Sequence, residues 1–181
     1  MARSLLLSLL VRQHLALKEK FRARYPHCWL VWESGAWNVS DGSEQNHGAT
    51  RLPNAELNDC LPAGDAMCFE LSPGRETLAI GRASHNAFVL NDATVSREHL
   101  LLHAREDGGW AVEALTQGGP ALLEGQRLAP GTVHSLESGM HLQLGDVQLT
   151  FHDADSFHER MGHTAALVLA QQQRTGPGRS A

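Results

Sequence analysis

Short runs of β-forming residues follow one another between Ala66 and Phe151, and they constrain the fold more than any other feature of the chain. Gly, Pro, Asn and Asp separate these runs at intervals of roughly eight to twelve residues. The runs read AMCFEL, TLAIG, AFVL, HLLLHA, WAVEAL, ALLEG, HLQLG and VQLTF. This cadence is typical of an all-β sandwich, so we expect a mainly β fold.

The residues before this region predict a helix, a hairpin and a linker, together spanning residues 1–65. Apolar residues recur at helical spacing ahead of Pro26, and they predict one amphipathic helix over residues 3–25. These residues are Leu6, Leu10, Leu17 and Phe21. The following CWLVWESGAWNVS predicts a Trp-rich hairpin that packs on this helix, and its unbroken apolar WLVW segment predicts a strand covered on both faces. The turn-rich sequence from Asp41 to Asp65 is expected to be a loop or linker.

A second amphipathic helix is expected after the sandwich, over residues 154–173. Ser156 and Glu159 have the spacing of a capping box. An apolar face follows, formed by Phe157, Met161, Ala165 and Val168. We expect both terminal helices to pack on their own sandwich, with an oligomer or partner interface as the alternative use of their apolar faces. Residues 174–181 are expected to be disordered.

Composition narrows the class of protein. The length of 181 residues fits one domain with an additional piece, and the net charge of −5 argues against broad binding to nucleic acid or anionic membranes. The three cysteines have no CxxC spacing, which favours free thiols in a reducing compartment. The Leu-rich start is too short to span a bilayer and has no cleavage site for export, so we expect a cytoplasmic protein, with export as the minor alternative.

Positive side chains lie at both ends of IGRASHNAFVLNDATVSREH, residues 80–99. Arg82 directly follows the turn-forming Gly81, and a second short loop contains Ser96 and Arg97. Arg82 and Ser96 are too far apart in the sequence to belong to one turn, so strand pairing is expected to bring the two loops together. A guanidinium can bind phosphate oxygens in a bidentate manner, and a serine hydroxyl can donate to another oxygen. The stretch therefore predicts an anion-binding site.

These residues, together with downstream ones, resemble the forkhead-associated (FHA) domain, a β-sandwich that binds phosphothreonine peptides. The resemblance rests on residues that occur in order over roughly half of the chain: Gly81, Arg82, Asp92, Val95, Ser96, Arg97, His99, Glu124, Gly125, Leu128, Leu136, Gly139, Leu142, Gly145 and Asp146. It implies a sandwich of about eleven strands over residues 66–153, flanked by the N- and C-terminal helices.

The resemblance also implies roles for individual residues. Arg82, Ser96 and Arg97 would contact the phosphopeptide, and Gly81, His99 and Gly125 would hold the loops in shape. Family members commonly have Asn-Gly-Thr in the loop before Glu124, where the asparagine bonds to the ligand main chain. Here Gly119, Pro120 and Ala121 occupy those positions. Gln117 is the expected substitute, with Gly119 beside the peptide, and the loss of one such contact weakens binding by about 1–3 kcal/mol.

The function that follows from the resemblance is a non-catalytic adaptor in serine/threonine kinase signalling. Its partner would be a protein carrying phosphothreonine, with the kinase acting upstream, and no cofactor is expected. The alternative is a scaffold that has the same fold and binds partners independently of phosphate. A hydrolase or metalloenzyme is a third hypothesis: no catalytic serine motif surrounds Ser96, and on a strand His99 and His103 would lie roughly 13 Å apart, too far to share a metal.

Overall fold

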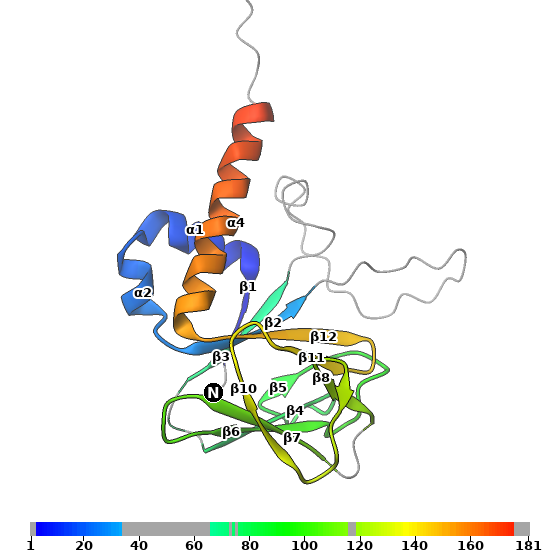
Figure 1. The fold of residues 1–181 in the computed structure, drawn as a ribbon. Coiled ribbons are helices and arrows are strands. Elements are labelled where there is room, and N and C mark those ends of the chain that lie inside the picture. Colours follow the sequence, from blue (N-terminus) through cyan, green and yellow to red (C-terminus); the bar gives the residue numbers. More distant parts are fainter. Residues whose placement is uncertain (1–2, 34–65, 73, 75, 116–118, 176–181) are drawn as a thin grey trace, which may run out of the picture.

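The structure is a computed structural model that describes residues 3–33, 66–72, 74, 76–115 and 119–175 (Figure 1). Within these ranges, twelve strands form two sheets, which confirms the predicted β-sandwich with flanking helices. The larger sheet has the order β1-β3-β2-β12-β11-β8-β9, and its strands are β1 (Arg3–Leu6), β3 (Met67–Leu71), β2 (Cys28–Glu33), β12 (Val147–His152), β11 (His141–Leu144), β8 (Ala121–Leu123) and β9 (Gln126–Arg127). The smaller sheet has the order β10-β7-β6-β4-β5, and its strands are β10 (Val133–Leu136), β7 (Trp110–Ala114), β6 (Leu100–Ala104), β4 (Thr77–Gly81) and β5 (Phe88–Val89). The helices are α1 (Leu7–Leu17), α2 (Lys20–Arg24) and α4 (Ala154–Thr175).

The sandwich core lies between the two sheets and follows from the alternation of apolar residues along the strands. In β6, for example, Leu100 and Leu102 are fully buried while Leu101 between them is half-buried. Leu142 and Leu144 of β11 enter the same core from the larger sheet. Each such leucine stabilises the fold by about 1.5–3 kcal/mol through burial.

The N-terminal segment differs from the single helix predicted over residues 3–25. Residues Arg3 to Leu6 form β1, an edge strand that pairs antiparallel with β3, and α1 begins only at Leu7. The helix then ends at Leu17, because Lys18 adopts a positive φ of 51° and turns the chain into the short α2. The prediction of one helix was wrong because Leu5 and Leu6 fit a strand as well as a helix, and the free edge of β3 determines which forms.

Strand β2 lies between β3 and β12, in the interior of the larger sheet. Leu30 faces the sandwich core, whereas Trp29 and Val31 face a second core beneath the helices, so both faces of the strand are covered as predicted. Residues 3–33 thus contribute two strands to a sandwich that the sequence assigned to residues 66–153 alone. The second arm of the predicted hairpin and the linker up to Asp65 lie outside the described residues.

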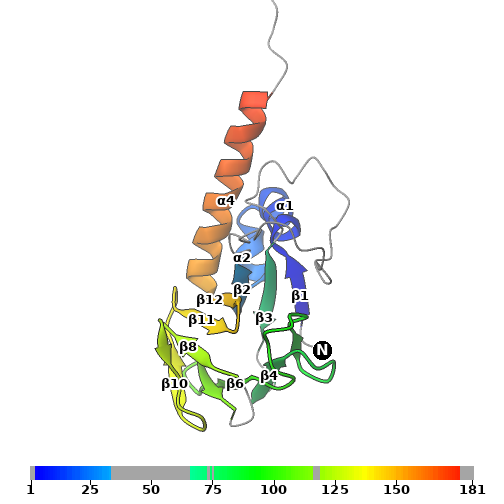
Figure 2. The ribbon, with the colours of Figure 1, turned by 90° about the vertical axis from the view of Figure 1, so that its right-hand side faces the viewer.

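The helices pack on the outer face of the larger sheet, and Figures 1 and 2 show them gathered beyond β2 and β12. The apolar face predicted for the C-terminal helix is buried there: Phe157, Met161, Ala165 and Val168 are all no more than 6% exposed. The Phe157 ring stacks on Trp29, with ring centroids 4.5 Å apart. The helix reaches Thr175, two residues further than predicted, and the rest of the predicted tail lies outside the described residues. None of the described helices is long and apolar enough to cross a membrane.

Candidate functional site

Two loops of the smaller sheet lie side by side at one of its ends. Strand β4 pairs with β5 on one side and with β6 on the other, so the loop after β4 meets the loop that precedes β6. The main-chain N–H of Arg82 donates to the carbonyl oxygen of Ser96 at 2.8 Å, and that of Ala83 donates to the carbonyl of Arg97 at 3.0 Å. The structure therefore brings together the two loops that the sequence singled out.

The arginine side chains at this end offer unused donors. Arg82 is exposed, and its Nε donates to the carbonyl oxygen of Val95 at 3.2 Å. This bond orients the guanidinium and leaves both terminal amino groups without an acceptor among the described residues. Arg97 is also exposed, and its side chain makes no hydrogen bond or ion pair within the described part of the chain. Two positive groups are thus available to an anion.

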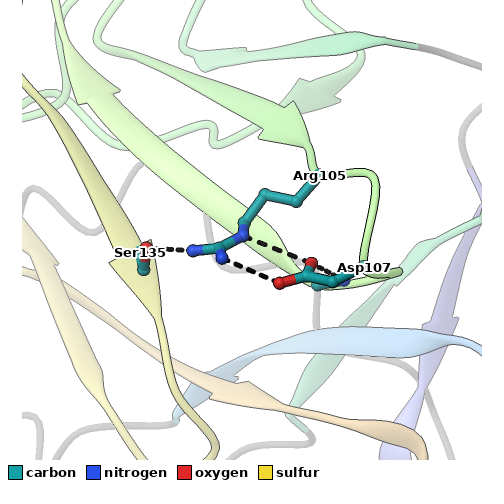
Figure 3. Close-up of polar contacts among 4 residues, drawn as sticks. Arg105, Asp107 and Ser135 are labelled. Carbon is teal, nitrogen blue, oxygen red and sulfur yellow. Dashed lines mark hydrogen bonds and ion pairs between the residues drawn. The ribbon is translucent and has the colours of Figure 1, made fainter.

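A third arginine shows the opposite situation at the other end of β6 (Figure 3). Arg105 binds both carboxylate oxygens of Asp107, with Nε and a terminal nitrogen donating at 3.2 and 2.7 Å, and it also donates to the hydroxyl of Ser135. A main-chain bond from Gly109 and then the Arg105 side chain lower the pKa of Asp107. Each of the three guanidinium nitrogens of Arg105 therefore donates a hydrogen bond within the protein, whereas in Arg82 only Nε does.

The Ser96 hydroxyl is fixed in place from the third loop, which follows β7. Its Oγ accepts a hydrogen bond from the main-chain N–H of Gly119 at 2.7 Å. Since the oxygen acts as an acceptor in that bond, the hydroxyl proton remains available to a ligand. Gly119 thus contacts Ser96 directly, and a Cβ at Gly119 would lie 3.2 Å from that oxygen.

His99 lies fully buried beneath these loops. Its Nδ1 accepts from the main-chain N–H of Ser96 at 3.1 Å, which places the ring proton on Nε2, and Nε2 faces the carbonyl of Pro120 at 3.4 Å. Burial lowers the pKa of His99, while its bonds to the main chain at Pro120 and Gly119 act in the opposite direction. A neutral imidazole therefore joins the loop before β6 to the loop after β7.

Of the two glycines predicted to shape the loops, Gly81 lies at the site and Gly125 does not. A Cβ at Gly81 would lie 2.4 Å from the carbonyl oxygen of Arg97, so only glycine allows the loops to approach this closely. Gly125 has a φ of 75° and closes the β8–β9 hairpin of the other sheet. In the described part of the chain no contact joins Gly125 to Arg82, Ser96 or His99. Gln117 lies outside the described residues.

Sequence reasoning missed several residues that hold the loops. Asn86 is buried, and its Nδ2 donates to the carbonyls of Ala83 and Arg97 at 2.9 and 2.6 Å. The side chains of His85 and Glu98 bond across the same two loops at 2.7 Å. Asparagine in a short turn after Gly-Arg is a signal for such a role, because its amide readily bonds to nearby main chain.

A hydrogen bond that the sequence did not predict also anchors the loop before β6 to the larger sheet. Thr94 donates to Asp92 through both its main-chain N–H and its hydroxyl, at 2.8 and 2.6 Å. The Thr94 hydroxyl oxygen in turn accepts from the main-chain N–H of Asp146, in the β11–β12 turn, at 2.9 Å. The loop containing Ser96 is therefore fixed at its start as well as at its end.

The described residues do not form a metal site. There, no three His, Cys, Asp or Glu side chains are close enough together to hold a metal ion. The His103 imidazole bonds instead to Glu113 on the neighbouring strand, at 2.7 Å. Cys28 is a free thiol, and burial raises its pKa to about 11.

Two packed sheets with these loops at one end of the smaller sheet define a β-sandwich of the FHA type, which confirms the expected resemblance. Similar solved structures include the FHA domain of a hypothetical protein from Arabidopsis thaliana, with 26% identity over 48% of this chain and 73% of that one, and a TM-score of 0.44. An FHA domain from Chlamydia trachomatis has 23% identity over 48% of this chain and 84% of that one, with a TM-score of 0.43. The N-terminal FHA domain of Rad53p from S. cerevisiae, solved with a phosphothreonine peptide, has 17% identity over 74% of this chain and 98% of that one, with a TM-score of 0.46.

No curated protein matches the sequence. Residues 62–155, more than half of the chain, match the family described as the inner membrane component of T3SS, cytoplasmic domain, where T3SS denotes the type III secretion system. The chain belongs to this family.

Proposed function

We propose that this chain is a non-catalytic module that binds a phosphothreonine peptide through Arg82, Ser96 and Arg97. The observation that supports this most is the pairing of Arg82 with Ser96: their main chains are bonded at 2.8 Å, and both side chains keep donors for a ligand. The terminal amino groups of Arg82 would grip two phosphate oxygens, and the Ser96 hydroxyl would donate to a third. Arg97 would add a second positive charge or reach the peptide main chain.

The strength of such a site follows from the number of its contacts. Charge-assisted hydrogen bonds contribute roughly 1.5–3 kcal/mol each, but a flexible peptide loses conformational entropy when it binds. We therefore expect micromolar or weaker affinity, about −8 kcal/mol. Binding should weaken as salt rises, because both arginines are exposed to solvent.

Several finer features belong to the same proposal. The peptide main chain would lie along the loop after β7, with Gln117 in place of the usual asparagine and Gly119 holding Ser96. A serine/threonine kinase would supply the phosphate, and the module would act on the cytoplasmic side of the membrane. Exposed apolar residues on α4, such as Leu167 and Leu169, would allow self-association through the terminal helices.

A second candidate function is a phosphate-independent scaffold within a secretion assembly. The family match favours it, because that family is a component of a multiprotein apparatus. The substitution of Gly119, Pro120 and Ala121 for the usual asparagine motif also favours it. In this case the sandwich would bind its partner through surfaces other than the three loops.

Titration of the full chain with peptides separates the two candidates. A degenerate peptide library centred on phosphothreonine would be compared with the same library containing threonine, in the wild type and in Arg82→Ala. The matched control is Arg105→Ala, which removes an arginine of the same sheet that is already occupied. If the chain binds phosphothreonine, the wild type should bind the phosphorylated library alone. This binding should be lost in Arg82→Ala and kept in Arg105→Ala. Equal binding of both libraries, or of neither, would favour the scaffold.

A further inference from the structure

An aromatic cluster of His14, Phe21 and His158 lies where α1, α2 and α4 meet. The imidazole centroids of the two histidines are 5.9 Å apart, and each ring packs edge-on against the fully buried Phe21 at 5.1 Å. All three residues lie outside residues 62–155, the part of the chain that matches the family. The cluster is therefore separate from the loops of the candidate phosphopeptide site, and it lies in the contact that joins the N-terminal helices to α4.

One nitrogen of each imidazole is buried without a hydrogen-bond partner. These atoms are Nδ1 of His14 and Nε2 of His158, and neither has a partner among the described residues. A buried N–H without an acceptor is strongly disfavoured, so in neutral rings these two nitrogens carry no proton. The proton of each neutral ring then lies on its other nitrogen. The packed arrangement of the helices thus fits two neutral imidazoles.

Protonation of either ring would disturb this contact. A second proton has to enter the buried nitrogen, because the other nitrogen of the ring already carries one. The charged ring would then hold a buried N–H with no acceptor. At 5.9 Å, two charged rings would also repel each other. The closed arrangement of α1, α2 and α4 therefore disfavours proton uptake by the cluster.

The charged groups around the cluster do not offset this cost. Those that face it from the turn after α1, from α2 and from α4 are Lys18, Glu19, Arg22 and Asp155. They are two cations and two carboxylates, so their charges balance, and in the described part of the chain no carboxylate forms an ion pair with either ring. Burial lowers the pKa of His158, and the positive charges of His14 and Arg22 lower it further. An imidazolium at His158 is therefore left without a compensating partner.

The helical segment that carries His14 can open without breaking the sheet. Helices α1 and α2 lie between β1, which pairs with β3, and β2, which pairs with β3 and β12. Main-chain hydrogen bonds hold both strands, whereas the helices between them are held by an apolar core that they share with α4. Their buried side chains in this core are Leu7, Leu10, Val11 and Phe21. Residues 7–24 are therefore the unit that would move.

We propose that the aromatic cluster is an acid-sensitive latch: protonation of His158 favours a state in which α1 and α2 open away from α4 while the sandwich stays folded. The apolar core still favours the closed state, so the open state is a minor one whose population rises as the pH falls. In the closed state the pKa of His158 lies below its ordinary value of 6.5, so the open state takes up this proton at a higher pH. The closed state is thus fully favoured above about pH 6.5. Below that value the open population rises by up to about tenfold per pH unit, until the closed-state pKa is reached.

Hydrogen exchange of the ¹⁵N-labelled full chain at about pH 6.5 and pH 5.5 tests the latch, because exchange detects open states that are rarely populated. Protection factors, which correct for the intrinsic pH dependence of exchange, would be compared between amides of α1 and sandwich amides such as those of Leu102 and Leu142. The proposal requires the protection of α1 to fall severalfold more than that of the sandwich. An equal change in the two regions, or none in α1, would overturn it.

His158→Phe assigns the opening to one residue. Phenylalanine keeps a ring in the contact and takes up no proton, and the buried nitrogen that it replaces has no partner in the closed state. The additional fall in α1 protection should therefore disappear. His163→Phe is the matched control, because His163 is an exposed histidine of the same helix, and it should behave as the wild type. A fall that persists in His158→Phe would refute the latch.

The imidazole resonances of the wild type give an independent measurement that does not depend on the folding of a variant. If the latch exists, His158 should titrate below its ordinary pKa of 6.5, and the protection of α1 should fall over the pH range that leads down to this titration. A His158 that titrates at or above its ordinary value would overturn the proposal. The phosphopeptide site enters neither measurement, so its failure and that of the latch are distinguishable.

Discussion

The loop end and the helix end of this molecule are held together by different forces. At the loop end, His99, Asn86 and Ser96 fix three loops through hydrogen bonds to main-chain groups, and the charged side chains remain in solvent. At the helix end, rings such as Trp29 and Phe157 stack in an apolar core. Hydrogen bonds depend on distance and angle, whereas apolar burial depends mainly on area. Substitutions at the loop end should therefore change binding more than stability, and those at the helix end should do the reverse.

The largest effect is expected at the helix end, from Phe157→Ala. This change removes a fully buried ring that stacks on Trp29, and it should lower the free energy of unfolding by about 3–5 kcal/mol. Phe157→Leu keeps most of the side-chain volume, so it should lower the free energy of unfolding clearly less. Urea unfolding measures both variants, and phosphopeptide affinity of the folded protein should stay at the wild-type value. A loss below about 1 kcal/mol in Phe157→Ala would show that the helices contribute little to the stability of the sandwich.

At the loop end, the corresponding destabilising substitution is Gly81→Ala. The new Cβ would lie 2.4 Å from the carbonyl oxygen of Arg97, which belongs to the main chain and has little room to move. We expect a loss of about 1–3 kcal/mol in stability and a large loss of phosphopeptide affinity, because Arg82 and Ser96 would be pushed apart.

Gly162→Ala is the matched control for that change. Gly162 lies inside α4, and the nearest atom to a new Cβ is on His14 at 4.0 Å. Alanine should stabilise the helix by about 0.5–1 kcal/mol and leave peptide binding unchanged. If Gly81→Ala bound peptide as well as Gly162→Ala, close approach of the two loops would not be what creates the site.

The same contrast explains what the sequence could predict. The cadence of short strands and the face of Phe157, Met161, Ala165 and Val168 are periodic, so local patterns were sufficient for the sandwich and for the C-terminal helix. The split of residues 3–25 was not predictable, because Leu5 and Leu6 pair with residues far away in the sequence, on β3. The bonds of Asn86 to Ala83 and Arg97, and the bond between Thr94 and Asp146, were not predictable for a related reason: the partner atoms belong to the main chain, and main-chain groups leave no trace in side-chain patterns.

A smaller effect is expected from pH, through His99. Burial holds the pKa of His99 below its ordinary value of 6.5, so the unfolded chain takes up this proton at a higher pH than the folded chain does. The contribution of the neutral ring is therefore complete above about pH 6.5. It declines as the pH falls from there toward the folded-state pKa.

Thermal unfolding between pH 8 and pH 5 measures this decline. His99→Gln should be less stable at every pH but should show a shallower fall than the wild type, since glutamine does not titrate. Phosphopeptide binding by the wild type should weaken over the same range, because a proton on Nδ1 would break the bond from the Ser96 main chain. Parallel stability curves for the two proteins would assign the pH dependence to other histidines, such as His158.

The smallest effect is expected from Arg105→Ala, and it is the sharpest comparison with Arg82. Arg105 makes more hydrogen bonds than Arg82, yet its bonds to Asp107 and Ser135 lie at the surface, where solvent and salt screen them. Its removal should shift the melting temperature by no more than about 2–4 °C and leave phosphopeptide affinity at the wild-type value. Arg82→Ala should also leave stability nearly unchanged, but it should abolish the preference for the phosphorylated peptide. The arginine with the fewer protein contacts would then be the one that functions, because unused donors on an ordered loop are what an anion requires.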